Sequence, residues 1–313
     1  LHGVQAQRRA RRRRARRPQR GLHHDLRRPG VDPAVAHLLQ RPRLDLDGAE
    51  KFLFRLADGA KVEAVYIPAP RRRASAGGER VTVCVSSQAG CAVNCAFCVT
   101  GRLGAGRNLT AGEILGQYIV IAREKAFGPR EANVVFRGMG EPLLNLANVS
   151  GALDLFESEV SPRRTTVSTA GVVPGIRELA RRERRPNLAV SLTAAGNALR
   201  TQLMPINAQW PVEELFAALE DWPLEPGRRI TFEVVLIAGV NDSPAEARAL
   251  ARLVKRVPSK VNLIPLNESA EWLPGLSRPS RESVDAFGSL LASSPNARCV
   301  APRPCAARPP RRS

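Results

Sequence analysis

The sequence predicts an α/β protein built on a parallel sheet. Six short apolar runs rich in β-branched residues recur from residue 81 onward, and stretches with helical starts lie between them. Strands joined by helical crossovers form a parallel sheet, either a partial barrel or a doubly wound sheet. In both arrangements ligands bind at the carboxyl ends of the strands, so a site is expected in the loops that follow strands.

A β-hairpin is expected ahead of this sheet. Residues 1–48 are rich in Arg, broken by Pro and without periodicity, so no fold is assigned to them. Two alternating apolar runs, 52–56 and 62–67, then flank a turn at 57–59. Residues 70–80 form a polar loop, which makes 49–80 a hairpin extension.

The strands and helices of residues 81–297 follow in order. The strand candidates are Val81–Ser86, Asn133–Arg137, Thr165–Thr169, Asn187–Leu192, Ile230–Ile237 and Lys260–Leu266. Thr110 and Glu113 have the spacing of a capping box and predict a helix start. Ser243 and Pro244 predict another, as an N-cap followed by a proline at the first helical position. Residues 298–313 are expected to be a basic, Pro-rich tail.

The net charge of +19 is concentrated at the two ends of the chain. Residues 1–30 hold eleven Arg and one acidic residue, and residues 298–313 hold five Arg and none. Arg neutralises phosphate and releases counterions, so a polyanion such as nucleic acid is the expected partner. The alternative is that the Arg runs are simply disordered.

Three closely spaced thiols, Cys91, Cys95 and Cys98, predict a metal or cluster site. Thiolates prefer zinc, copper(I) or iron–sulfur, and three ligands leave one metal position open for a substrate. A dense cluster in a long chain with few other Cys is typical of cytosolic metal binding. All four His precede the first predicted strand, which argues against a Cys/His zinc site. A cytoplasmic protein is expected, because no apolar run approaches the about 18 residues of a membrane span and no signal peptide is evident.

Polar residues also follow other predicted strands. Two glycines in 138–142 would let the backbone approach a ligand, and Glu141 could accept from an ammonium or a ribose hydroxyl. Ser168, Ser191 and Asn267 lie at or just beyond strand ends and could bind a polar cofactor. The alternative is local: such glycines often make turns, and such serines often bind nearby backbone.

These residues carry a resemblance to a known family. The Cys-x3-Cys-x2-Cys spacing, with Phe97 before the third Cys, resembles the radical S-adenosylmethionine (SAM) superfamily. The wider sequence resembles the RlmN/Cfr class of RNA adenine methyltransferases in Cys84–Cys91, Arg107–Thr110, Gly138–Asn145, Val167–Pro174, Met204–Asn207, Gly239–Asp242 and Val261–Asn267. The resemblance implies a partial (β/α)6 barrel of the radical SAM type with a small N-terminal β-hairpin extension.

The resemblance also implies cofactors and residue roles. Cys91, Cys95 and Cys98 would bind a [4Fe-4S] cluster whose fourth iron takes SAM. The positions that match SAM contacts are Gly140, Glu141, Ser168, Ser191, Thr193 and Asn267. Because carbon 2 of adenine is electron-poor, methylation there needs a carbon radical, which the family forms on an S-methylated Cys. A second Cys, matched by Cys84, resolves the resulting adduct as a disulfide, and Glu63 matches the family's general base.

Three departures from the family pattern stand out. Thr193 occupies a position where the family usually has His, and residues 1–48 offer no counterpart of the family's helical RNA-binding domain. The methyl-bearing Cys lacks its usual surroundings: Cys305 is the nearest candidate, while Cys299 falls where a last strand should run. The Arg- and Pro-rich ends, with Leu1 as the first residue, lead to the hypothesis that both ends arise from shifted reading frames or misplaced boundaries.

The expected function is methylation of carbon 2 of an adenine in 23S ribosomal RNA, and also in transfer RNA. A reducing partner such as flavodoxin, no membrane and a monomeric state are expected. One alternative is a homologue that keeps the cluster but not methyl transfer, and another is methylation of adenine carbon 8. The last alternative is an RNA-binding protein with a structural zinc site that uses Cys84 as its fourth ligand.

Overall fold

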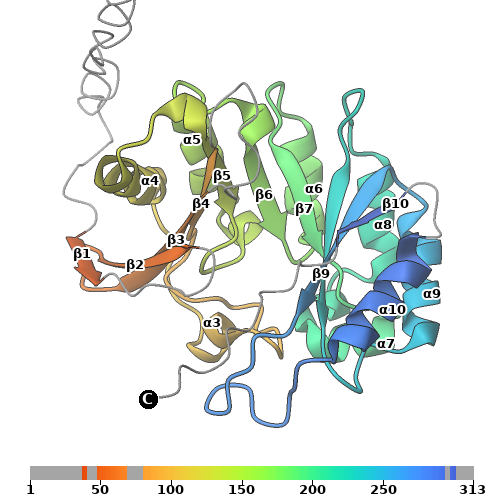
Figure 1. Cartoon of the computed structure of the whole chain (residues 1–313). Coiled ribbons are helices and arrows are strands. Elements are labelled where there is room, and N and C mark those ends of the chain that lie inside the picture. Colours follow the sequence, from red (N-terminus) through yellow and green to blue (C-terminus); the bar gives the residue numbers. More distant parts are fainter. Residues whose placement is uncertain (1–36, 41–47, 69–79, 293–296, 301–313) are drawn as a thin grey trace, which may run out of the picture. The chain divides into compact units, whose positions relative to one another are not determined.

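The computed structural model describes residues 37–40, 48–68, 80–292 and 297–300, all within one compact unit that spans residues 34–313. These residues form a single sheet in which ten strands follow one another in chain order, β1 to β10 (Figure 1). The strands from β4 to β10 pair in parallel with one another. The fold is a partial α/β barrel, as the sequence predicts.

The six predicted parallel strands are confirmed within one residue at each end. The parallel strands are β4 (Val81–Val85), β5 (Ala132–Phe136), β6 (Thr165–Thr169), β7 (Asn187–Ser191), β8 (Ile230–Leu236), β9 (Ser259–Pro265) and β10 (Ala297–Val300). In β10, Cys299 pairs with Val261 of β9. Cys299 therefore lies in a last strand, where the sequence places it.

The predicted hairpin is confirmed and is continuous with the barrel sheet. Strands β2 (Glu50–Arg55) and β3 (Lys61–Ile67) are antiparallel, and β3 also pairs antiparallel with β4. One strand was not expected: β1 (His37–Gln40) pairs with β2, inside the segment 1–48 that has no sequence periodicity. A four-residue edge strand is too short to give a periodic signal. The predicted domain boundaries stay predictions, since one sheet runs across the boundary at residue 80.

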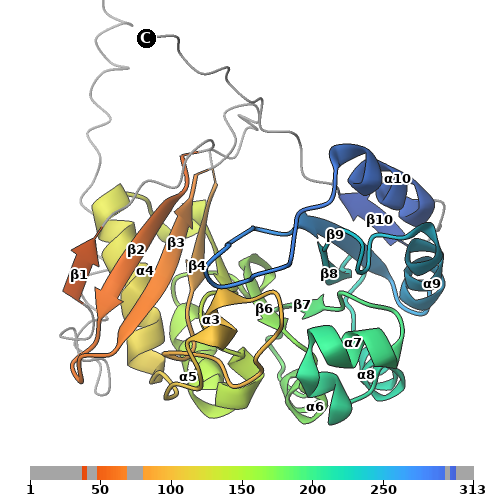
Figure 2. The same cartoon turned by 90° about the horizontal axis from the view of Figure 1, so that it is seen from below.

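The helices from residue 111 onward connect the parallel strands and lie along one side of the curved sheet (Figure 2). The α-helices are α3 (Val99–Arg102), α4 (Ala111–Lys125), α5 (Leu146–Phe156), α6 (Val173–Ala180), α7 (Asn197–Leu203), α8 (Val212–Glu220), α9 (Pro244–Val254) and α10 (Arg281–Ala292). Single 3-10 turns are η3 (Pro129–Glu131), η4 (Pro142–Asn145), η5 (Pro162–Arg164) and η6 (Pro205–Ala208). Among the described residues, none of these helices has the length and apolar character that a bilayer span requires.

Both predicted helix starts are confirmed. The Thr110 hydroxyl accepts from the Glu113 N–H at 3.1 Å, and the Glu113 carboxylate accepts from the Thr110 N–H at 2.8 Å. At α9, the Ser243 hydroxyl accepts from the Glu246 N–H at 3.2 Å. These caps satisfy backbone donors that the first helical turn leaves without partners.

The two faces of the sheet differ in character. On β4 the side chains of Val83 and Val85 are fully buried, and on β5 Phe136 packs edge to face on Phe156 of α5. This is the face that the helices cover. Since side chains alternate along a strand, Cys84 lies on the opposite, concave face, where it is half-buried. The concave face is therefore the one on which polar chemistry can reach solvent.

Candidate active site

The three-thiol loop, Cys91 to Cys98, lies over the carboxyl ends of the parallel strands. It follows β4, and the Ala96 N–H donates to the Leu203 carbonyl at 2.9 Å. Cys91 and Cys95 pack against a buried apolar cluster, whose members are Val93, Ala170, Ala194, Leu203, Met204, Ile237, Leu266 and Leu273. Several of these residues follow β6, β7, β8 and β9. The loop therefore lies where ligands bind in such folds, and it packs on this buried apolar cluster.

Burial raises the pKa of two thiols of this loop, Cys91 and Cys95. Burial raises the pKa of Cys91 to about 11, and it raises the pKa of Cys95 further; the charge of Cys98 acts in the same direction on both. Within the described residues, no group of three or more His, Cys, Asp or Glu side chains is arranged as a preformed metal site. The three thiols nevertheless interact electrostatically, since Cys98 acts on Cys91 and both act on Cys95. Metal ligation by Cys requires the thiolate, so binding of a shared metal would release protons from this loop.

The loop after β5 packs tightly on the loop after β4. A Cβ at Gly138 would lie 2.6 Å from the Ser86 Oγ, and one at Gly140, where φ is +98°, would lie 2.5 Å from the Gln88 Cβ. Glycine is required at both positions by the neighbouring loop. This contact between the two loops accounts for both glycines, and backbone approach to a ligand stays a prediction.

Glu141 is a buried carboxylate beneath the thiol loop. It is 3% exposed, and it accepts from the backbone N–H of Leu143 at 3.0 Å and of Ala170 at 2.6 Å. Burial raises its pKa, while these hydrogen bonds act in the opposite direction. Its charge also acts on Cys91 and Cys95, which places it close to the thiols.

Arg200 is a fully buried cation at the same place, and sequence reasoning missed it. Its guanidinium donates to the Ala170 carbonyl at 2.7 Å, to the Asn207 Oδ1 at 2.8 Å, and to the carbonyls of Ser191 and Leu192 at 3.2 Å each. Burial lowers its pKa to about 10. Arg200 therefore holds the ends of β6 and β7 together beside the thiol loop. The only signal in the sequence was its nearness to the segment Met204–Asn207.

The remaining predicted cofactor contacts lie at the same strand ends. Thr193 is fully buried in a left-handed conformation, with φ of +56°, and its Oγ1 has no hydrogen-bond partner. The Ser191 carbonyl faces Arg200, as described above. Asn267 is exposed, and its Oδ1 accepts from Arg278 at 3.2 Å. The Ser168 hydroxyl donates to the Glu233 carboxylate at 3.1 Å, and its role as a cofactor contact stays a prediction.

Glu63 and Cys84 share the concave face but not the thiol loop. Val65 of β3 pairs directly with Cys84, so Glu63, two residues before Val65, lies on the same face and diagonally from Cys84. The Glu63 carboxylate forms an ion pair with Lys51 at 2.8 Å. Cys305, the candidate methyl-bearing residue, lies outside the described residues.

A second charged pair on this face was not foreseen. Arg137, just after β5, forms an ion pair of 2.9 Å with the buried Glu233 of β8. The two residues are far apart in the sequence. No local sequence pattern could therefore have predicted this ion pair.

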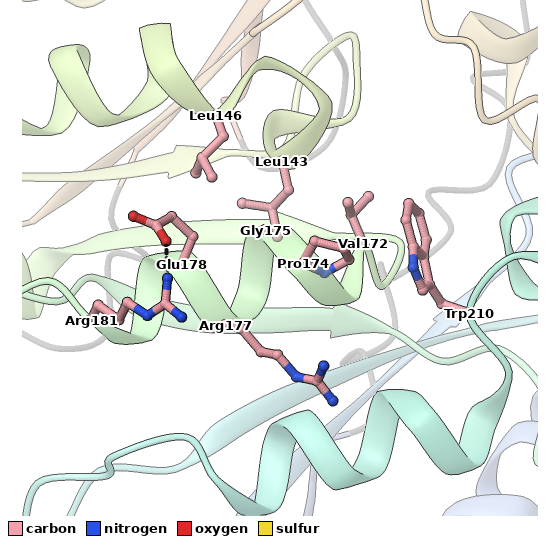
Figure 3. A pocket seen from close by; sticks show the side chains of 9 residues that line it. All are labelled: Leu143, Leu146, Val172, Pro174, Gly175, Arg177, Glu178, Arg181 and Trp210. Atoms are coloured by element: carbon pink, nitrogen blue, oxygen red, sulfur yellow. Dashed lines mark hydrogen bonds and ion pairs between the residues drawn. The ribbon is translucent and has the colours of Figure 1, made fainter.

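A cavity of about 580 Å³ lies between α6 and the segment that carries Leu143 and Leu146 (Figure 3). Its lining residues are Leu143, Leu146, Val172, Pro174, Gly175, Arg177, Glu178, Arg181 and Trp210. None of the predicted cofactor residues lines it. The candidate active site is therefore the strand-end region described above, and not this cavity.

Sequence comparison places the chain among known proteins, although no protein-family model matches it. The probable dual-specificity RNA methyltransferase RlmN of Akkermansia muciniphila is 46% identical over 245 residues, which cover 77% of this chain and 67% of the relative. The dual-specificity RNA methyltransferase RlmN of Syntrophobacter fumaroxidans is 45% identical over 268 residues, which cover 84% and 74%. The chain belongs to the RlmN family.

A solved structure agrees with this assignment to the RlmN family. A radical SAM methyltransferase from Sphaerobacter thermophilus is 41% identical, with a TM-score of 0.76 over 87% of this chain and 79% of that one. The family is one of radical SAM methyltransferases, so the protein is an enzyme. The predicted family and the predicted partial barrel are both confirmed.

Proposed function

We propose that the protein methylates carbon 2 of an adenine in 23S ribosomal RNA, and in transfer RNA, using a [4Fe-4S] cluster and SAM. The observation that carries this proposal is the three-thiol loop held over Glu141 and Arg200 at the carboxyl ends of the strands. The names of the RlmN relatives, dual-specificity RNA methyltransferases, support RNA as the substrate.

The residues present fit the two cofactors. Cys91, Cys95 and Cys98 offer three soft donors, and the first two pack against the buried apolar cluster. Three protein donors suit a [4Fe-4S] cluster in which the fourth iron binds another ligand. The buried Oγ1 of Thr193 lacks a partner, as expected of a group that binds a polar ligand. Glu141 supplies an acceptor for an ammonium group. The other proposed SAM contacts are Gly140, Ser168, Ser191 and Asn267.

When bound, the cluster and SAM would supply a carbon-centred radical, which is the reactivity that an electron-poor aromatic carbon requires. The protein's own residues then have distinct tasks. Cys305 is our candidate for carrying the methyl group. Cys84 is our candidate for releasing the product, by forming a disulfide with Cys305. Glu63 is our candidate proton acceptor, and it is supported by its place on the same face as Cys84.

The partners follow from the same proposal. The Arg-rich ends would contact RNA phosphates, and a reducing protein such as flavodoxin would supply electrons. A cytoplasmic, monomeric protein remains our expectation.

One alternative loses support and another stays open. A four-thiol zinc site needs Cys84 beside the other three, but the charged groups that act on Cys84 are Arg137 and Glu233, and not those thiols. A homologue that cleaves SAM without transferring a methyl group stays a candidate, because Cys305 lacks the family's surrounding sequence.

Anaerobic reconstitution with iron and sulfide, followed by reduction in the presence of SAM, tests the proposal. We expect a brown protein that releases 5′-deoxyadenosine or methylated product, and peptide mass spectrometry should find an S-methyl group on Cys305. A colourless protein that binds zinc and leaves SAM intact would reject the radical enzyme. SAM cleavage without an S-methyl Cys or a methylated RNA would support the transfer-deficient homologue.

A further inference from the structure

On the concave face, Cys84 lies near a group of three polar side chains, which are Arg137, Glu233 and Ser168. Cys84 belongs to β4, Arg137 follows β5, Ser168 belongs to β6 and Glu233 belongs to β8. Cys84 pairs in register with Val135, so Arg137, two residues further along, projects on the same face and diagonally from Cys84. Strand register thus brings Arg137 to the thiol.

Glu233 fixes the position of Arg137. Their ion pair measures 2.9 Å, and the Glu233 side chain is 7% exposed whereas that of Arg137 is 41% exposed. The other oxygen of Glu233 accepts from the Ser168 hydroxyl at 3.1 Å. A carboxylate that is hydrogen-bonded through both oxygens is held in place, and its ion pair restrains the Arg137 guanidinium near the sheet.

Arg137 acts on Cys84 in two ways. Its guanidinium charge favours the thiolate, and its backbone N–H donates a hydrogen bond to the same sulfur. Burial opposes both effects and dominates, so that the pKa of Cys84 is raised to about 11; the Glu233 charge also raises it. Along the neighbouring strands, Glu63 and Lys51 face the same side of the sheet as an ion pair of their own.

We propose that Arg137, anchored by Glu233, is a positioning residue that favours the thiolate of Cys84. The proposal rests on the proposed function, in which Cys84 resolves the adduct. There, the thiolate attacks the sulfur that links protein and RNA, an S–S bond forms, and the C–S bond breaks. Its electron pair passes to the carbon, which takes a proton and becomes the methyl group. A thiol cannot make this attack, since the thiolate is the nucleophile.

The arrangement also joins Cys84 to a proposed cofactor contact. Ser168, which matches a SAM-binding position, is the second partner of Glu233. A ligand that takes the Ser168 hydroxyl would remove one of the two hydrogen-bonded contacts of Glu233. The anchor of Arg137 would then depend on what occupies the site.

Peptide-resolved alkylation tests this role without measuring methyl transfer. The full chain, kept under anaerobic conditions, is treated with isotope-coded iodoacetamide over a series of pH values, and tandem mass spectrometry follows the rate at Cys84. Arg137→Met should slow alkylation of Cys84 by about tenfold at pH 8, because loss of an adjacent charge shifts a pKa by about one unit or more. In the Arg137→Lys variant the alkylation rate of Cys84 should stay within about threefold of that in the original protein. Glu233→Gln should raise this rate.

The control is Arg256→Met, which removes another Arg–Glu ion pair, of 2.7 Å, on the helical side; the Arg256 side chain is 37% exposed, close to the 41% of Arg137. This variant should leave the alkylation rate of Cys84 and its pH profile unchanged. The proposal is overturned if Arg137→Met and Glu233→Gln change the rate in the same direction, as general loosening would, or if Arg137→Met leaves the pH profile unaltered. Failure of the proposed function has a different signature: methyl transfer would be absent while these opposite shifts at Cys84 persist.

Discussion

Glu141 and Arg200 hold the same strand-end residue from two sides. The Glu141 carboxylate accepts from the Ala170 N–H at 2.6 Å, and the Arg200 guanidinium donates to the Ala170 carbonyl at 2.7 Å. The end of β6 is therefore held between a buried carboxylate and a buried guanidinium, beneath the thiol loop. Such fixation keeps the loops in place when a ligand binds.

Arg200→Met should destabilise the protein strongly. The substitution leaves the carbonyls of Ala170, Ser191 and Leu192 without their charged donor, and each buried group so stranded costs about 1–3 kcal/mol. At about 2 °C per kcal/mol for a chain of this size, we expect the melting temperature to fall by roughly 6–18 °C in a thermal unfolding scan. Arg252→Met, on an exposed position of α9, is the control and should shift it by less than about 2 °C. Equal melting temperatures for the two variants would contradict a structural role for Arg200.

Thr193→Val should separate stability from SAM binding. Valine keeps the shape and the same left-handed strain, and it removes a buried hydroxyl that has no partner in the protein. The melting temperature should therefore stay the same or rise. SAM affinity, measured by calorimetry, should weaken by about 2- to 10-fold, the value of one hydrogen bond. Unchanged affinity would remove Thr193 from the SAM site.

Glu113→Gln should lower stability in a pH-dependent way. Burial raises the pKa of Glu113, but its hydrogen bonds with Arg107 and Thr110 outweigh burial and hold the pKa below the ordinary 4.5. Because the folded-state pKa is the lower one, this contribution is present above pH 4.5 and is lost as the pH falls further. The variant should melt roughly 2–6 °C lower at pH 7, and the difference should shrink towards pH 3. A difference that grows on acidification would reverse the assigned sign.

Cys95→Ser should abolish retention of iron and sulfide after anaerobic reconstitution, because it removes one of the three proposed cluster ligands. Cys84→Ser is the matched control, since Cys84 lies on β4 and not in the thiol loop, and it should retain both elements. Iron and sulfide analysis with visible absorption decides the outcome. Loss of iron in both variants would revive the four-thiol site.

The strands and caps were predictable because their signals are local. Val81–Val85 and Thr165–Thr169 are short runs of β-branched residues, and Thr110 with Glu113 forms a capping box within one helical turn. The thiol loop was found for the same reason, since its three Cys lie within eight residues.

The rest of the site depends on contacts between residues that are distant in the chain. Arg137 and Glu233 meet only because β5 and β8 belong to one curved sheet. The buried Arg200 donates to carbonyls at the ends of other strands, which its own sequence neighbours do not reveal. Gly138 is required by Ser86 of another loop, a contact that no sequence window contains. Strand β1 escaped prediction because four residues give no period.

The measurement that tests the central claim most directly is nucleoside mass spectrometry after reaction. The reconstituted, reduced protein is incubated with a 23S ribosomal RNA fragment and SAM carrying a deuterated methyl group, and the RNA is digested to nucleosides. The proposal predicts labelled 2-methyladenosine, which is absent from a parallel reaction of the Cys95→Ser variant. Labelled 8-methyladenosine would assign the other carbon, and cleaved SAM with no labelled adenosine would contradict methyl transfer to RNA by this protein.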